Sequence, residues 1–291
     1  MKKVAWFVNQ RGGVISAPYS RGDMKLKVVI LALLFGSGIT ACSLEECDYV
    51  VCESKPFIRK KHLLDAVVSS TNWSGYVASS NLLHPTNYLV TQVSGSWIVP
   101  DVKAAGVDTN CSIWVGIDGA GSPSVEQLGT EHDYSNGQEN HYAWWEMFPA
   151  GSNLLVGFPV AVGDSISASV TFVPLVGILP AGNTLFILQI VNNTQKKYSI
   201  IPAITTTIMQ RVCAEWIVEA PWLNVTLPLS DFGVVSMFNC SAQINGLSGP
   251  INNPAWQNES MNMSSPDGTL KAITSPLSAD GKSFSVQWLH T

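Results

Sequence analysis

The chain has 291 residues, of which 46% are hydrophobic and 13% charged, and its formal net charge is −5. A globular domain usually has about 25% charged residues. The hydrophobic share excludes a disordered chain, and the acidic balance argues against a nucleic-acid binder. Ten Trp, 23 Gly and 16 Pro favour short strands and turns over helices.

Residues 1–41 are predicted to be a signal segment, with Met24 as an alternative start of translation. A basic stretch at 24–27 precedes eight apolar residues, 28–35, which are too few to span a bilayer. The sequence Ile-Thr-Ala-Cys that ends at Cys42 resembles the lipobox of bacterial lipoproteins. That resemblance implies lipidation of Cys42 and a lipid anchor in the cell envelope. A plain signal-peptidase cut near Ala41, with secretion, is the alternative.

The remainder of the chain after residue 41 is strongly acidic, with 10 basic and 20 acidic residues. This balance argues against binding to nucleic acid or to an anionic surface. In an exported chain a disulfide is expected, and Cys47 and Cys52 are the closest pair in sequence. Residues 42–70 are interpreted as a tether or a short pro-segment.

From residue 71 onward, apolar runs alternate with turn residues and no long amphipathic helix intervenes. This pattern predicts an all-β fold, an antiparallel sandwich or barrel, in one domain of residues 71–291. We expect it to be a monomer. In chain order the predicted strands are Trp73–Ser79, Tyr88–Val99, Ser112–Ile117, Val125–Thr130, His141–Phe148, Ser165–Phe172, Thr184–Val191, Cys213–Glu219, Val234–Asn239 and Ser283–Leu289.

Two of these strands place carboxylates among apolar neighbours. Alternation puts Glu215 and Glu219 on one face of strand 213–219, and it puts Glu146 between Trp144 and Phe148 on one face of strand 141–148. A single such Glu usually faces solvent, because burial of an unpartnered carboxylate is unfavourable. Two such strands together indicate a lined cleft.

The common catalytic signatures are absent from the sequence, which has no GxSxG, HExxH, P-loop or DTG motif. His132 and His141 lie near Asp133 and Glu139, but their spacing fits no usual metal site. We interpret them as exposed loop histidines and expect neither a metal nor another cofactor.

Five motifs in order resemble those of the glutamic peptidases, or eqolisins. They are NWSGY (72–76), WVGIDG (114–119), EQLGT (126–130), AWWEMFP (143–149) and AEWIVE (214–219). The resemblance implies a lectin-like sandwich of two antiparallel sheets, here in a bacterial lipoprotein-type member. It also implies an endopeptidase that hydrolyses protein or peptide substrates at acidic pH.

The resemblance assigns roles by position, with Gln127 and Glu219 as the catalytic pair. Gln127 cannot titrate, so its amide would orient a water and donate a hydrogen bond to the oxyanion, while Glu219 would transfer the protons. Glu215 and Glu219 are roughly 13 Å apart along the strand, too far to share a proton. By resemblance the substrate-binding residues are Trp114, Asp118, Trp144, Glu146 and Glu215.

The sequence also departs from the fungal pattern of that family. The segment between Gln127 and Trp144 is about three residues longer, so the acid that supports the catalytic Gln is Glu131 or Asp133. Phe148 replaces a frequent Tyr. Two other functions remain open: a sandwich without activity that binds peptide or glycan, and a glycoside hydrolase that uses Glu146 and Glu219 as its carboxylate pair.

Overall fold

The structure is a computed structural model that describes residues 3–8, 14–19, 52–54, 69–174 and 183–291. It divides into two compact units, Met1–Glu46 and Cys47–Thr291. In the first unit, β1 (Lys3–Val8) and β2 (Val14–Tyr19) form an antiparallel hairpin. The apolar run 28–35, the predicted lipidation site Cys42 and most of the segment 42–70 lie outside the described residues. In the part that is described, no helix has the length and apolar character needed to cross a membrane.

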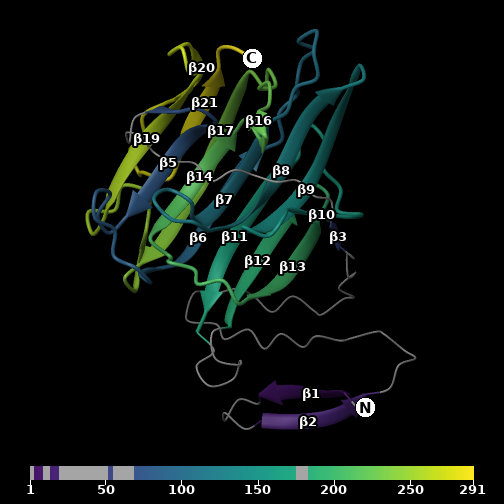
Figure 1. The fold of residues 1–291 in the computed structure, drawn as a ribbon, viewed down its shortest axis with the longest axis vertical. Helices are drawn as coiled ribbons and strands as arrows, with labels where there is room; N and C mark the ends of the chain where they lie inside the picture. The colour runs from purple at the N-terminus through teal and green to yellow at the C-terminus, as the bar shows by residue number, and fades with distance from the viewer. Residues whose placement is uncertain (1–2, 9–13, 20–51, 55–68, 175–182) are drawn as a thin grey trace. The chain divides into compact units, whose positions relative to one another are not determined.

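The second unit is all-β, as the sequence predicts, and its strands form two antiparallel sheets (Figure 1). In spatial order, the first sheet, which we call the site sheet, contains β3 (Cys52–Ser54), β10 (Asn153–Leu155), β9 (Gln138–Phe148), β8 (Val125–Ser135), β7 (Ser112–Asp118), β14 (Cys213–Glu219), β5 (Trp73–Ser79) and β19 (Gln257–Ser264). The second sheet contains β13 (Lys197–Thr205), β12 (Thr184–Asn192), β11 (Ser165–Val173), β6 (Val90–Ile98), β17 (Val234–Ile244), β21 (Phe284–Trp288), β20 (Leu270–Thr274) and again β19.

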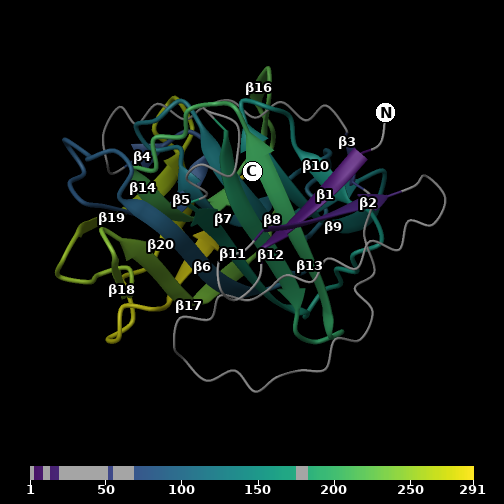
Figure 2. The same cartoon turned by 90° about the horizontal axis from the view of Figure 1, so that it is seen from below.

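Strand β19 belongs to both sheets. Its first part, Gln257 to Met261, pairs with β5, and its second part, Met263 and Ser264, pairs with β20. The short β4 (Ser69–Ser70) lies parallel to it. The two sheets therefore form a sandwich that is joined along one side, and Figure 2 shows its two layers.

Three short strands complete the unit. Strand β18 (Leu247–Gly249) pairs with the end of β17, while β15 (Trp222–Leu223) and β16 (Val225–Thr226) pair with each other in a small hairpin. This β15–β16 hairpin follows β14 directly in the sequence.

The core lies between the two sheets, and β14 shows how the sequence fills it. Ala214, Trp216 and Val218 join the inter-sheet core, whereas Cys213 and Ile217 join a smaller cluster on the opposite face. This is the alternation predicted for the strand. The face of the site sheet that points away from the second sheet therefore carries Glu215 and Glu219, and we call it the site face.

All ten predicted strands are present, and the bounds of β5 and β14 coincide with the prediction. Strands β8 and β9 are longer than predicted because the two-residue turn Asn136-Gly137 joins them directly. Both turn residues have positive φ (53° and 77°), as a type I′ turn requires. Residues 131–140, between the two predicted strands, therefore belong to a β-hairpin.

Strand β13 is absent from the prediction because Pro202 interrupts its apolar pattern. Proline lacks the N–H that a central strand needs, so it is confined mainly to edge strands. Among the described strands β13 pairs only with β12, and this edge position accommodates the proline.

Candidate active site

The site face is a grid of side chains from four neighbouring strands, β14, β7, β8 and β9. Cross-strand register defines three rows. The first row is Glu215, Gly116, Gln127 and Glu146; the second is Ile217, Trp114, Gly129 and Trp144; the third is Glu219, Ser112, Glu131 and Tyr142. Gln127 and Glu219 thus lie on the same face, two strands apart and four residues apart along the strands.

Gln127 is held by its cross-strand neighbour Glu146. The amide Nε2 of Gln127 donates to Oε2 of Glu146 at 2.6 Å, and both residues are buried. A carboxylate accepts hydrogen bonds, so it fixes the amide with its nitrogen toward Glu146. Among the residues that the structure describes, the amide oxygen of Gln127 has no hydrogen-bond partner. That oxygen and the second N–H are the groups that could bind a ligand.

Glu219 is held from two sides. Its Oε2 accepts from the indole Nε1 of Trp114 at 2.8 Å, and its Oε1 accepts from the amide Nδ2 of Asn72 at 3.4 Å. The side chain is 2% exposed. The two donors fix the orientation of the carboxyl group at the end of β14.

Trp114 lies between Gln127 and Glu219. It belongs to the middle row on β7, its N–H contacts Glu219, and its ring extends over Gly116, where an added Cβ would lie 2.9 Å from Cζ3. On the adjacent strand, a Cβ at Gly129 would lie 2.6 Å from the Cβ of Trp114. The two glycines leave room for the indole, which forms the floor between the amide and the carboxyl group.

The two acids considered as support for Gln127 occupy different places. Glu131 lies in the row of Glu219, and its Oε2 accepts a short hydrogen bond from Ser112 Oγ. Asp133 lies farther along β8 and accepts from Asn110 Nδ2 at 2.8 Å and from the Tyr142 hydroxyl at 3.3 Å. The acid in direct contact with Gln127 is instead Glu146.

Glu215 and Asp118 bind backbone groups. Glu215 Oε1 accepts from the N–H of Ala120 at 2.7 Å, and Asp118 accepts from the N–H groups of Arg211 and Val212, both at 2.7 Å. Burial raises the pKa of Asp118, and it raises the pKa of Glu215 well above 4.5. Both residues are 0% exposed and join the loop after β7 to the start of β14. Their contact with substrate remains a prediction.

The interpretation of His132 and His141 as exposed loop residues is wrong. They lie opposite each other on β8 and β9, their Nδ1 atoms are 2.9 Å apart, and His132 is 0% exposed. A hydrogen-bonded chain runs from Trp97 Nε1 to Thr130 Oγ1 (2.8 Å), to His132 Nε2 (2.8 Å), and through His141 to Glu139 (2.9 Å). Residue alternation alone does not reveal that His132 pairs with His141. The pairing depends on the Asn136-Gly137 turn, which joins β8 and β9 in one hairpin.

Proton positions in this chain follow from its two ends. Trp97 can only donate and an ionised Glu139 can only accept. Trp97 therefore donates to Thr130, and His141 donates from Nε2 to Glu139. Burial, together with His141, lowers the pKa of His132 well below 6.5, so His132 favours its neutral form.

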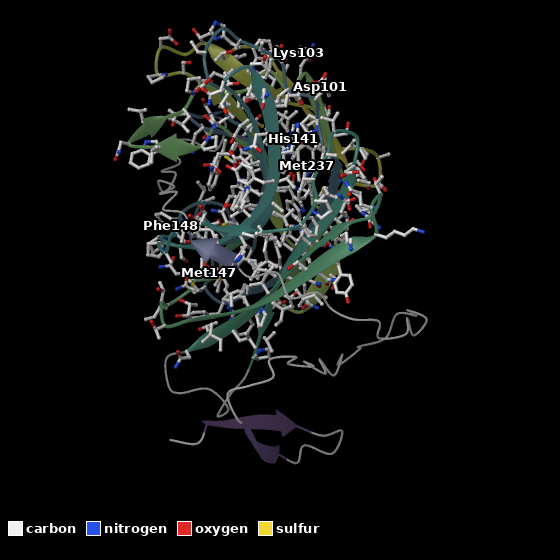
Figure 3. The ribbon with its side chains drawn as sticks, turned by 90° about the vertical axis from the view of Figure 1, so that its right-hand side faces the viewer. Asp101, Lys103, His141, Met147, Phe148 and Met237 are labelled. Atoms are coloured by element: carbon white, nitrogen blue, oxygen red, sulfur yellow. The ribbon has the colours of Figure 1, made fainter. Side chains whose placement is uncertain are left out.

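The hydrogen-bonded chain ends at Glu139, at one end of the sandwich. Glu139 contacts Asp101, and this contact raises the pKa of Asp101. Figure 3 shows Asp101 near His141, whereas Met147 and Phe148 lie toward the other end of β9. In the described parts of the chain, no group of three or more His, Cys, Asp or Glu side chains is arranged to hold a metal ion.

Two residues at the start of the domain belong to the site but are missing from the predicted set. Asn72 contacts Glu219, and the Trp73 ring packs edge-on against Trp114 with centroids 5.1 Å apart. Both lie in the NWSGY motif, so that motif is the sequence feature that could have identified them as site residues. Their role depends on the pairing of β5 with β14, which sequence alone does not specify.

Comparison with protein families gives a match to the peptidase A4 family over residues 71–288. The chain belongs to that family. It is 26% identical over 201 residues to Aspergillopepsin-2 of Aspergillus niger, an alignment that covers 61% of this chain and 66% of the relative, slightly under two thirds.

Solved structures of this family share the fold. Scytalido-glutamic peptidase with a transition state analog inhibitor superposes with a TM-score of 0.60 at 22% identity and covers 75% of this chain and 98% of its own. Aspergilloglutamic peptidase from Aspergillus niger gives 0.50 at 25% identity, covering 62% and 99%. Family membership supports a glutamic-type endopeptidase, the enzyme class expected from the sequence.

Proposed function

We propose that the chain is an exported endopeptidase that works in acidic surroundings, with Gln127 and Glu219 activating one water molecule. The observation that supports this most strongly is the arrangement around Trp114, which lies between an oriented amide and an oriented carboxyl group on one face of one sheet. A peptide that lies across the indole would have the Gln127 amide on one side and the Glu219 carboxyl group on the other. The substrate class is that of the family, proteins and peptides.

In this mechanism Glu219 takes a proton from water as the water attacks the peptide carbonyl carbon. The second N–H of Gln127 donates to the developing oxyanion, and its amide oxygen accepts from the water. Glu219 then returns the proton to the leaving nitrogen, so the peptide C–N bond breaks and atoms balance without an acyl-enzyme. Acidic surroundings favour protonation of the leaving amine.

The glycoside hydrolase alternative has less support. It requires Glu146 and Glu219 to flank one bond, yet they are three strands apart, with Gln127 and Trp114 between them, and Glu146 is bound to Gln127. The alternative of a binding protein without activity uses the same face and differs only in the absence of turnover.

Cleavage of a denatured protein by the purified full chain from pH 2 to 7 tests the proposal. We expect cleavage that resists chelators and pepstatin and falls by at least about 100-fold in Gln127→Ala and Glu219→Gln, because each loses a group that stabilises the transition state. Matched controls are Gln189→Ala and Glu259→Gln, which are outside the grid and should retain activity. Full activity in either site variant removes that residue from the mechanism, and a folded but inert wild type favours the binding protein.

Export has a separate test. Expression of the full chain in a bacterium, followed by mass spectrometry of the mature N-terminal peptide, distinguishes a lipidated Cys42 from an unmodified cut near Ala41. We expect the lipidated form in the membrane fraction. Recovery of an uncleaved chain in the cytosol contradicts export.

A further inference from the structure

The β15–β16 hairpin exposes apolar side chains beside the site. Leu223 is 42% exposed and Val225 is 64% exposed, and Asn224 between them makes the tip with φ 60°. Exposed tips of hairpins usually carry polar residues and glycine. Here no charged residue occurs from Ala220 to Ser230. The two aliphatic side chains that flank Asn224 therefore form a small uncharged apolar surface that is available to a ligand.

The hairpin is fixed to the site. It begins three residues after Glu219, and the intervening Ala220 donates its N–H to the carbonyl of Asn72, whose side chain holds Glu219. The N–H of Leu227 donates to the carbonyl of Pro221 at 2.8 Å and closes the base. The tip therefore has a defined position relative to the Glu219 carboxyl group.

The hairpin also projects on the appropriate side of the sheet. Figure 2 shows β16 rising from the layer that contains β14, on the side away from the second sheet, which is the side of the site face. The segment after the hairpin contacts Asn110, whose N–H donates to the carbonyl of Pro228 and whose side chain binds Asp133. The base of the hairpin is thus held beside the strands that carry the row of Glu219.

We infer that Leu223 and Val225 form an apolar subsite that determines which peptide bonds the enzyme cuts, by binding a large hydrophobic side chain of the substrate near the scissile bond. This inference rests on the proposed peptidase function. The occupant is a substrate peptide because the hairpin directly follows Glu219 in the chain and has no charged side chain, which favours an apolar side chain of the substrate over a charged ligand. One aliphatic contact of this kind typically discriminates 10- to 200-fold between substrates.

The test compares Leu223→Thr/Val225→Thr with a matched double variant, Val234→Thr/Leu270→Thr. The control residues are 58% and 43% exposed on strands β17 and β20. Threonine keeps the β-propensity of each strand. Cleavage sites in a denatured protein, mapped by mass spectrometry, identify the hydrophobic position in wild type. Two peptides with Leu or Ala at that position then give a ratio of kcat/KM.

We expect a Leu-to-Ala ratio of at least about 10 in wild type and in the control variant, and a ratio near 1 in Leu223→Thr/Val225→Thr. An unchanged ratio in that variant, an equal loss in the control, or no hydrophobic preference in wild type overturns the inference.

A binding experiment separates failure of the inference from failure of the proposed function. In the Glu219→Gln background, the Kd of a fluorescent peptide containing several Leu is compared with that of the same peptide with every Leu replaced by Ala. A preference for Leu that the hairpin double variant lowers supports the subsite even if wild type cuts nothing. An identical preference with and without the hairpin substitutions overturns it.

Discussion

Gln127 carries no charge at any pH, so the direction of its amide decides what it can do. The contact with Glu146 at 2.6 Å turns the nitrogen toward β9, and the amide oxygen has no hydrogen-bond partner among the described residues. Without that acceptor the amide could rotate and present either atom. Glu146 therefore acts as a positioning residue for Gln127.

Replacement of Glu146 by Leu, which is similar in size and accepts no hydrogen bond, should lower kcat by roughly 10- to 100-fold with a small change in KM, because a misoriented group loses about that much. Steady-state kinetics at the pH of maximal activity measures this. Glu146→Gln, whose side-chain oxygen can still accept, should retain more of kcat, and Glu259→Leu is the control. A kcat within twofold of wild type in Glu146→Leu would show that the amide does not need this contact.

At the residue scale, sequence predicted which side chains share a face but not how they touch. Alternation places Glu219 and Glu215 together, and the family motif selects Gln127. The contact of Trp114 with Glu219 depends on space left by Gly129 on the neighbouring strand, where an added Cβ would also lie 2.1 Å from the carbonyl oxygen of Ile113. That space arises only when the strands pair.

At the element scale, the β8–β9 hairpin determines the second half of the grid. Its register places Gln127 opposite Glu146 and His132 opposite His141. Because side chains alternate, a slip of one residue would move Gln127 to the inter-sheet core. The sequence contains the turn signal Asn136-Gly137, and a prediction that used it would have found the full length of both strands.

Gly137→Ala should therefore lower the free energy of unfolding by about 1 kcal/mol, because Gly137 has φ 77° and a Cβ there is strained although the surrounding space is open. Gly151→Ala is the control, since Gly151 also has open space but no positive φ. Chemical denaturation at fixed pH measures both variants. Equal stabilities of the two variants would mean that the turn does not require glycine.

At the scale of the whole molecule, buried groups with opposite responses to pH determine the acid range of stability. Burial raises the pKa of Asp118, and raises the pKa values of Glu126 and Glu215 well above 4.5; Asp118 adds to the rise at both. Burial lowers the pKa of His132 well below 6.5. In the folded chain all four groups therefore favour their neutral forms.

The signs follow from linkage. A carboxyl group with a raised folded pKa contributes stability that is complete below its unfolded pKa, near 4, and is lost as pH rises toward the folded value. His132, with a lowered folded pKa, contributes stability that is lost as pH falls below about 6.5. Three acids outweigh one histidine above about pH 4.5, and the histidine acts alone below about pH 4.

We therefore expect these four groups to place the maximum of the free energy of unfolding near pH 4, with a loss toward neutrality of up to about 1.4 kcal/mol per pH unit for each ionising carboxyl group. Urea denaturation between pH 3 and 7 measures the curve. Glu126→Gln, which is neutral at every pH, should flatten its upper side, whereas Glu139→Gln should not. A curve that rises continuously from pH 4 to 7 would contradict this assignment.

The position of β5 has a consequence for how the molecule is made. This first strand of the matched domain pairs with β14 and β19. Asn72, just before it, donates a hydrogen bond to Glu219, 147 residues away, and Ser74 within it donates to the carbonyl of Met261, 187 residues away. Contacts this distant in sequence form slowly, because a long loop must close first. During synthesis from the N-terminus, Trp73 can meet Trp114 early, but Asn72 cannot meet Glu219 until β14 has been made. The nascent chain therefore holds the Gln127 half of the site before the Glu219 half, and the two are joined only when β14 pairs between β5 and β7.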